Sequence, residues 1–237
     1  MNIDYSKDVE LRFDMLALIE HLLLQENLHS TIMFYTEIVI KLILLPCLEW
    51  RAGMPTTKIR KASVICLIKI MEKELIEKAK LATLLPELIN KLKSPLDDDW
   101  AHDLRFASVV LLTKTMAYFG DEMEREAFNE IYPELLKRLD DAQDGIRVET
   151  CKGFEVFFTY LPDPWSSSLY PYTIKQIFIH IDDPNNAIQQ AIVKVLEKAG
   201  RVQTEAFLEI ARDCESKFSH AVLVKNIIDH VLKTHLK

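Results

Sequence analysis

Residues 96–112 read LDDDWAHDLRFASVVLL, and related segments follow at a step of 42 residues as RLDDAQDGIRVETCKGF (138–154) and HIDDPNNAIQQAIVKVL (180–196). Each segment has two adjacent aspartates, an aliphatic residue six positions after the first of them, and a large apolar residue eight positions further on. The aspartate pairs are Asp98/Asp99, Asp140/Asp141 and Asp182/Asp183, and the apolar residues are Leu104, Ile146 and Ile188, then Leu112, Phe154 and Leu196. Polar and apolar positions therefore share one register.

Each repeat of this pattern predicts two helices. The second aspartate of a pair stands where a side-chain oxygen can cap the first free amides of the next helix. These expected caps are Asp99, Asp141 and Asp183. The apolar residues downstream, such as Ile188, Ile192 and Val195, are spaced by three, four and seven and fall on one helix face. Upstream of each pair lies another apolar run, which contains a proline.

A period of roughly 40 to 47 residues built from two helices is typical of HEAT and armadillo arrays. The predicted fold class is all-α, a HEAT-type α-α superhelix, or solenoid, in which each repeat packs on its neighbours. We expect one leading helix near 8–25 and about five helix pairs, with residues 1–237 forming a single array. The expected pairs are 30–49 with 56–72, 75–93 with 99–119, 121–139 with 143–160, 166–181 with 184–199, and 202–214 with 217–235.

Composition and charge narrow the class of protein. Hydrophobic residues make up 49% of the 237 and only 5 are glycine, as in folded helical proteins. The net charge of -7 argues against nucleic acid as the main partner, because Lys and Arg would have to neutralise phosphates. The four cysteines match no metal or redox spacing, so we expect buried thiols in a reducing compartment. They are Cys47, Cys66, Cys151 and Cys214.

The most apolar run, residues 32–48, is nearly long enough to span a bilayer. It contains Glu37, Lys41 and Pro46, and each central charge costs roughly 2.5 to 3.5 kcal/mol to insert. The first ten residues, MNIDYSKDVE, lack the apolar core of a signal peptide. We therefore expect a buried amphipathic helix, no membrane partner and no export.

Three arginines occupy equivalent places in successive second helices, where stacking would set them in a row. They are Arg60, Arg105 and Arg147, and Gln189 takes the place in the next repeat. The row either pairs with neighbouring aspartates as a structural ladder or binds a ligand, and we favour the ladder.

All three tryptophans, Trp50, Trp100 and Trp165, fall at or beside loops. Tryptophan is enriched in binding hot spots, so these are the candidate partner-binding residues. Loop tryptophans also fold back onto helix ends, and both interpretations stay open. The segment Asp97–Asp99 with Trp100 is the favoured contact, because its connection is about five residues longer than its counterpart after Pro133.

Sequence motifs for catalysis are missing. The chain has no Gly-rich phosphate loop, no H-E-x-x-H and no nucleophile elbow. The seven histidines are scattered and show no ligand spacing. We therefore predict no catalytic residue, no cofactor and no metal.

Two motifs carry a family resemblance. HIDDPNNAIQQAIVKVLEKAG (180–200) and IYPELLKRLDD (131–141) resemble the C-terminal HEAT repeats of the dynein axonemal assembly factor 5 family. LLPCLEWRAG (44–53) with IRKASVICL (59–67) resembles the preceding repeat, whereas 74–130 and 201–237 carry no matching motif. The resemblance implies the C-terminal part of a longer repeat protein, for which Met1 would be an artificial start.

The resemblance also implies a function. Members of this family help to preassemble the dynein arms of motile cilia in the cytoplasm, so the implied partners are axonemal dynein subunits, other assembly factors and chaperones. A missing preceding repeat would uncover apolar positions of residues 13–24, and we expect self-association through that N-terminal end. Two alternatives stay open: a transport or phosphatase scaffold on the same fold, and a nucleic-acid-acting HEAT enzyme with a basic concave face.

Overall fold

The computed structural model describes residues 5–235, and every regular element within them is helical, with no strand. The predicted all-α class is confirmed. Contacts divide the chain into two compact units, Met1–Phe119 and Gly120–Lys237, which we describe separately. The prediction of one array over 1–237 stays a prediction.

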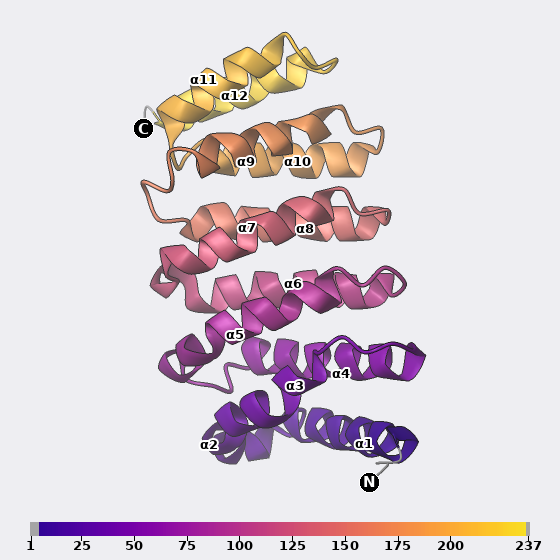
Figure 1. The fold of residues 1–237 in the computed structure, drawn as a ribbon. Helices are drawn as coiled ribbons and strands as arrows, with labels where there is room; N and C mark the ends of the chain where they lie inside the picture. The colour runs from indigo at the N-terminus through magenta and orange to yellow at the C-terminus, as the bar shows by residue number, and fades with distance from the viewer. Residues whose placement is uncertain (1–4, 236–237) are drawn as a thin grey trace. The chain divides into compact units, whose positions relative to one another are not determined.

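The first unit contains the expected leading helix and two helix pairs. The leading helix is α1 (Tyr5–Leu23). In the first pair, α4 (Met54–Glu72) follows an interrupted helix made of η1 (Glu26–Leu28), α2 (His29–Val39), the π-helical turn η2 (Ile40–Leu44) and α3 (Leu45–Cys47). The second pair is α5 (Lys78–Leu96) and α6 (His102–Phe119). Figure 1 shows α1, α4 and α6 stacked in one layer of this unit, with the first helix of each pair in a second layer.

The second unit contains three pairs, whose helices are also arranged in two layers. It begins at η3 (Gly120–Glu122) and continues through α7 (Arg125–Leu139) and α8 (Asp144–Tyr160). The next pair is α9 (Leu169–Phe178), extended by η4 (Ile179–Asp182), with α10 (Asn186–Ala199). The last is α11 (Thr204–Glu215) with α12 (Ala221–His235). Helices α8, α10 and α12 pack in one layer and α7, α9 and α11 in the other (Figure 1). The predicted pairs are therefore confirmed, with ends shifted by a few residues.

Several prolines lie inside or at the start of helices. Pro86 lies inside α5 and Pro133 inside α7. Pro46 follows the π-helical turn η2. The wider turn fits the chemistry of proline, whose missing amide and bulky ring disturb the preceding helical turn.

The recurring apolar positions form the core of both units. Leu104, Ile146 and Ile188 each expose at most 2% of their surface. Burial of one such side chain stabilises the fold by roughly 1.5 to 3 kcal/mol, so the 42-residue register is also the register of the core. All four cysteines are free and buried, and burial raises the pKa of the Cys66 and Cys151 thiols to about 12.

Gly200, just after α10, allows two elements to meet closely. A Cβ atom at this position would lie 2.5 Å from Cγ2 of Val231 in α12 and 3.0 Å from Cδ1 of Phe207 in α11. Any larger residue must therefore displace the side chains of Val231 and Phe207.

Helix α2 is less buried than expected. Its exposed apolar residues include Phe34 (79% exposed) and Ile38, and Leu42 of the following π turn is also exposed. Among the described residues, the helical stretch Glu26–Cys47 is long and apolar enough to cross a membrane, with a mean hydropathy of 1.6. Only 28% of its most apolar 18 residues are buried. The prediction of a buried helix over 32–48 holds for its end, where Leu44, Leu45 and Leu48 are buried, and is wrong for the face around Phe34.

Candidate partner-binding groove

Two arginines of the row, Arg60 and Arg147, hold adjacent helix pairs together. In the first unit, Nη1 of Arg60 donates to the Arg51 carbonyl at 3.1 Å and Nη2 donates to Oδ2 of Asp98 at 2.5 Å. The two side chains of this ion pair are 2% and 4% exposed. The guanidinium thus binds the loop of its own pair and a carboxylate of the next pair. A buried charge needs such partners, which supports the structural interpretation of the row.

Arg147 repeats this arrangement in the second unit. Its Nε donates to the Leu139 carbonyl at 2.8 Å, and its Nη2 donates to Asp183 of the next pair. At the equivalent place in α10, Nε2 of Gln189 donates to the Ile181 carbonyl at 2.8 Å. Glutamine therefore keeps the contact within its own pair. The last two helices have no pair of adjacent aspartates, so the ion pair that Arg147 makes has no equivalent carboxylate here.

A different carboxylate links the last pair to its neighbour. Asp182 accepts hydrogen bonds from the amides of Ser219 and His220 at 2.8 and 3.0 Å, just before α12 begins, and from both of their side chains. Partial burial alone would raise the pKa of Asp182, but these hydrogen bonds hold it at about 2. Asp182 thus caps the start of α12 from the preceding pair.

The expected capping aspartates have a different role in detail. Asp141 and Asp183 accept from the amides of Gln143 and Asn185, which lie in the turn before the helix. The residue that caps α10 is Asn185, whose side chain accepts from the Ala187 amide. The aspartates therefore brace the turn.

In the first unit the bracing residue is Asp98, and the assignment to Asp99 is corrected. Oδ1 of Asp98 accepts from the amides of Trp100 and Ala101 at 3.1 and 2.8 Å, whereas the side chain of Asp99 is exposed. Helices α6, α8 and α10 start at His102, Asp144 and Asn186 and so keep the 42-residue step. The bracing contact alone is made one position earlier in the first unit. Arg105, at 8% exposure, donates to the Asp98 carbonyl at 2.7 Å and so fastens the same loop.

Trp165 belongs to the core of the second unit. It is 3% exposed, donates from Nε1 to Asn129 at 2.8 Å, and packs edge to face on Tyr132 and Phe157. Of the two interpretations left open for the loop tryptophans, folding back onto helix ends describes Trp165, whose ring has no exposed face in this unit. The proline and serine residues around it carry the chain over a buried indole, which a loop composition alone does not reveal.

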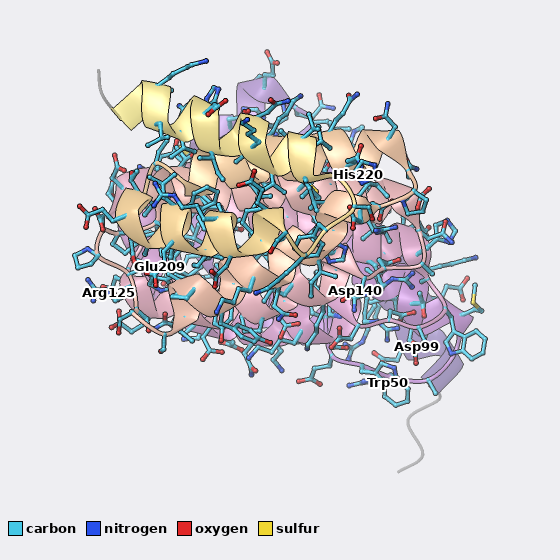
Figure 2. All side chains as sticks on the ribbon, turned by 90° about the horizontal axis from the view of Figure 1, so that it is seen from above. Trp50, Asp99, Arg125, Asp140, Glu209 and His220 are labelled. Atoms are coloured by element: carbon cyan, nitrogen blue, oxygen red, sulfur yellow. The ribbon has the colours of Figure 1, made fainter. Side chains whose placement is uncertain are left out.

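Trp50 and Trp100 meet at one groove of the first unit. Trp50 lies after α3 and is 66% exposed, and Trp100 lies before α6 and is 92% exposed. Between them is a groove of about 370 Å³, which we call the tryptophan groove. It is lined by residues 50–54, Thr57, Arg60 and residues 97–100. Figure 2 shows Trp50 and Asp99 together at this edge of the unit.

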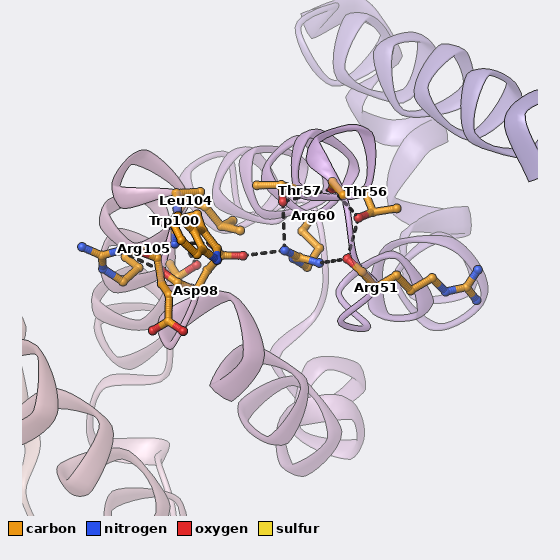
Figure 3. Close-up of polar contacts among 12 residues, drawn as sticks. Arg51, Thr56, Thr57, Arg60, Asp98, Trp100, Leu104 and Arg105 are labelled. Atoms are coloured by element: carbon orange, nitrogen blue, oxygen red, sulfur yellow. Dashed lines mark hydrogen bonds and ion pairs between the residues drawn. The ribbon is translucent and has the colours of Figure 1, made fainter.

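The floor of the tryptophan groove is rigidly bonded, as Figure 3 shows. Arg60 joins the two loops through Arg51 and Asp98, and its Nη2 also contacts Oγ1 of Thr57 at 3.1 Å. Oγ1 of Thr56 donates to the carbonyls of Arg51 and Gly53. These bonds fix the backbone on both sides while both indoles remain in solvent. The groove is thus suited to contact another molecule through aromatic rings on a prepared frame.

Sequence reasoning identified both tryptophans and Asp97–Asp99 but did not bring them together. Residues 51–54, which complete the lining, have no sequence pattern that predicts a binding site. Gly53 has φ +105°, a conformation that favours glycine and here turns the chain into α4. Among residues 5–235, no group of three or more His, Cys, Asp and Glu side chains has metal-binding geometry.

No family model matches the sequence, whereas curated relatives do. The dynein axonemal assembly factor 5 of Mus musculus is 25% identical over 234 residues, and that of Homo sapiens is 26% identical over 234, each match covering 95% of this chain and 27% of the relative. The Xenopus laevis protein of that name is 25% identical over 210 residues, or 85% of this chain and 25% of the relative. The resemblance seen in the motifs is confirmed, and the chain spans about a quarter of the length of these relatives.

Solved structures show the same fold. A designed armadillo repeat protein, determined in complex with a (KR)4 peptide, matches with a TM-score of 0.59 at 13% identity, over 98% of this chain and 95% of that one. An engineered protein matches with a TM-score of 0.60 at 10% identity, over 98% and 93%. The chain is therefore an all-α repeat protein of the armadillo and HEAT type.

Proposed function

We propose that this chain is part of a non-enzymatic binding scaffold that helps to preassemble the dynein arms of the ciliary axoneme in the cytoplasm. The observation that carries the proposal is the similarity to three proteins named dynein axonemal assembly factor 5, two of them over 95% of the chain. The proposed partners are axonemal dynein subunits, other dynein assembly factors and chaperones.

The structure is physically compatible with this role. Stacked helix pairs offer an extended surface for another protein. The arginines and aspartates of the row, which would be the first candidates for chemistry, are engaged in bonds that hold the pairs together. An assembly factor must also release its client. Release favours a contact of moderate size with a few aromatic anchors over a large apolar interface.

Affinity capture from the cytosol of ciliating cells tests the proposal. The bait is the tagged protein, and the matched control is the designed armadillo repeat protein, which shares the fold at 13% identity. We expect axonemal dynein subunits to be enriched on the bait relative to the control. Equal recovery on both baits would contradict the proposal.

The same experiment separates the alternatives. Enrichment of transport receptors or phosphatase subunits, without dynein subunits, would favour a general scaffold of the same fold. Salt-dependent binding to DNA in a separate titration would favour the nucleic-acid alternative, which the net charge of -7 opposes.

A further inference from the structure

We infer that a groove between α1 and α2 of the first unit binds an amphipathic helix of a partner protein. We call it the α1–α2 groove, and it shares no lining residue with the tryptophan groove. The inference does not depend on the assembly proposal, because it identifies its ligand by shape and polarity.

The α1–α2 groove is apolar. It has a volume of about 250 Å³ and lies between two neighbouring helices of the first unit (Figure 1). Its lining includes Ile19 and Leu22 of α1, Ile32, Tyr35 and Val39 of α2, and the fully buried Ile70 of α4. Thr36, which also lines it, donates from Oγ1 to the Ile32 carbonyl at 2.9 Å and so needs no partner from a ligand. The groove therefore suits an apolar surface.

The packing of the other helices indicates which shape fills such a groove. In the second unit α7 contacts both α8 and α9, and α9 contacts both α10 and α11. In the first unit α3 contacts both α4 and α5. In each case a first helix lies between the second helix of its own pair and the first helix of the next pair. Because α1 and α2 are likewise a second helix and the first helix of the next pair, the groove between them is shaped for a helix.

Both walls of the groove continue as apolar stripes. Their exposed apolar residues are spaced by three, four and seven positions, which places them on one side of each helix. They are Leu11, Leu18 and Leu22 on α1, and Tyr35, Ile38 and Leu42 from α2 into the π turn. An amphipathic helix places its own residues i, i+3, i+4 and i+7 against stripes of this kind. By contrast, Val222 is the one exposed large hydrophobic residue in the described parts of α11 and α12, so an uncovered helix of this chain need not be apolar.

The concave shape selects a helix over two other occupants. A flat bilayer surface would touch the rims at Leu22 and Tyr35 but would not reach Ile70, which is fully buried. Two copies of the protein that met groove to groove would leave both grooves unfilled, because two concave surfaces are not complementary. One helix fills the groove and covers both rims.

A neutral peptide with the sequence of α7, REAFNEIYPELLKRL (Arg125–Leu139), is the probe. This helix fills the equivalent groove of the second unit, between α8 and α9. Its basic and acidic side chains balance, so the net charge of -7 on the protein does not attract it: Arg125, Lys137 and Arg138 against Glu126, Glu130 and Glu134. The control peptide loses the large apolar residues that α7 buries, through Phe128→Gln, Ile131→Gln, Leu135→Gln and Leu139→Gln.

Titration of the labelled peptides with the whole chain, followed by fluorescence anisotropy, measures binding. We expect the probe to bind and the control peptide not to bind. Affinity should change little between about 0.15 M and about 0.5 M salt, because the contact is apolar. An isolated helix of about 15 residues is marginal in water, so the free probe should be largely unfolded. The chemical shifts of its Cα carbons should move to helical values on binding.

Variants of the protein locate the binding site. Leu22→Ala and Tyr35→Ala should each weaken binding at least about fivefold, because each removes part of an apolar wall. Leu24→Ala and Phe34→Ala are matched controls that should leave affinity unchanged, since both residues are exposed and neither lines the groove. Circular dichroism should show unchanged helicity and melting for all four variants, because every changed side chain is exposed.

Four results would overturn the inference. One is no binding at about 1 mM of either the probe or a version held helical by a covalent link between positions 126 and 130, which are exposed in α7. Another is an affinity that the two groove variants and the two controls change equally. The third is a dimer in sedimentation whose mass the probe leaves unchanged, because a second copy would then hold the groove. The fourth is binding to phosphatidylcholine vesicles that Tyr35→Ala abolishes, because this face would then contact lipid.

Discussion

Replacement of Arg60 by methionine should destabilise the first unit strongly. The change removes three contacts, to the Arg51 carbonyl, to Thr57 and to Asp98, and leaves the Asp98 carboxylate buried without its cation. Loss of one partner from a buried ion pair costs about 3 to 5 kcal/mol. Asp98 retains two amide donors, so we expect a value near the lower end, about 3 kcal/mol.

The control is Arg12→Met in α1. Arg12 pairs with Asp8 one helical turn away, and the two side chains are 32% and 29% exposed. Such a pair contributes only about 0.3 to 0.5 kcal/mol. The two arginines therefore differ in burial while the substitution is the same.

Urea unfolding followed by circular dichroism measures the total loss, and hydrogen exchange at the amides of Trp100 and Ala101 localises it. Both amides should exchange faster in Arg60→Met. In the double variant Arg60→Met/Asp98→Asn, the loss should be about 1 to 2 kcal/mol smaller than the sum of the single losses, because the unpaired charge is gone. If Arg60→Met costs no more than Arg12→Met, the buried ion pair does not hold the two helix pairs together.

Three further predictions follow from particular contacts. Gly200→Ala should lower the melting temperature, because its Cβ clash costs about 1 to 3 kcal/mol. Gly145→Ala should not lower the melting temperature, because a Cβ there meets nothing within 4 Å. Equal melting of both variants would contradict this prediction. Because the pKa of Asp182 is lowered from 3.8 to about 2 in the fold, its contribution to stability is complete above about pH 5 and is lost as pH falls toward 2. Asp182→Asn should remove that part of the acid transition seen by circular dichroism, and an unchanged transition would refute the capping role. The protein should self-associate at high concentration through the apolar residues of 13–24, where Phe13 and Leu18 of α1 are exposed, and Phe13→Glu with Leu18→Glu should reduce the weight-average mass in sedimentation; an unchanged mass would place the contact elsewhere.

The fold was largely predictable because one register determines both the core and the turns. The buried residues Leu104, Ile146 and Ile188 repeat in step with the aspartates that brace each turn. The apolar positions and the polar positions therefore predict the same helix pairs independently. Helix ends were less predictable. In the first unit the bracing contact is made by Asp98, one position before the 42-residue register predicts, although α6 itself starts in register, and only the path of the backbone reveals such a shift.

The candidate site was only partly predictable. Trp50, Trp100 and Trp165 all stand in loop sequences, yet Trp165 is covered by Tyr132 and Phe157 while the others stay in solvent. Whether a loop tryptophan folds inward depends on the space left by neighbouring helices. The groove itself joins residues about 50 positions apart, and their meeting depends on the Arg60 contacts across successive pairs.

The distribution of the protein between cytosol and axonemes tests the proposed function most directly. Quantitative mass spectrometry of the cytosol and of salt-washed axonemes from the same ciliated cells gives the ratio of this protein to axonemal dynein subunits in each fraction. An assembly factor should associate with dynein subunits in the cytosol and be nearly absent from finished axonemes. Stoichiometric recovery with dynein in the salt-washed axonemes would instead identify a structural component and contradict the assembly role.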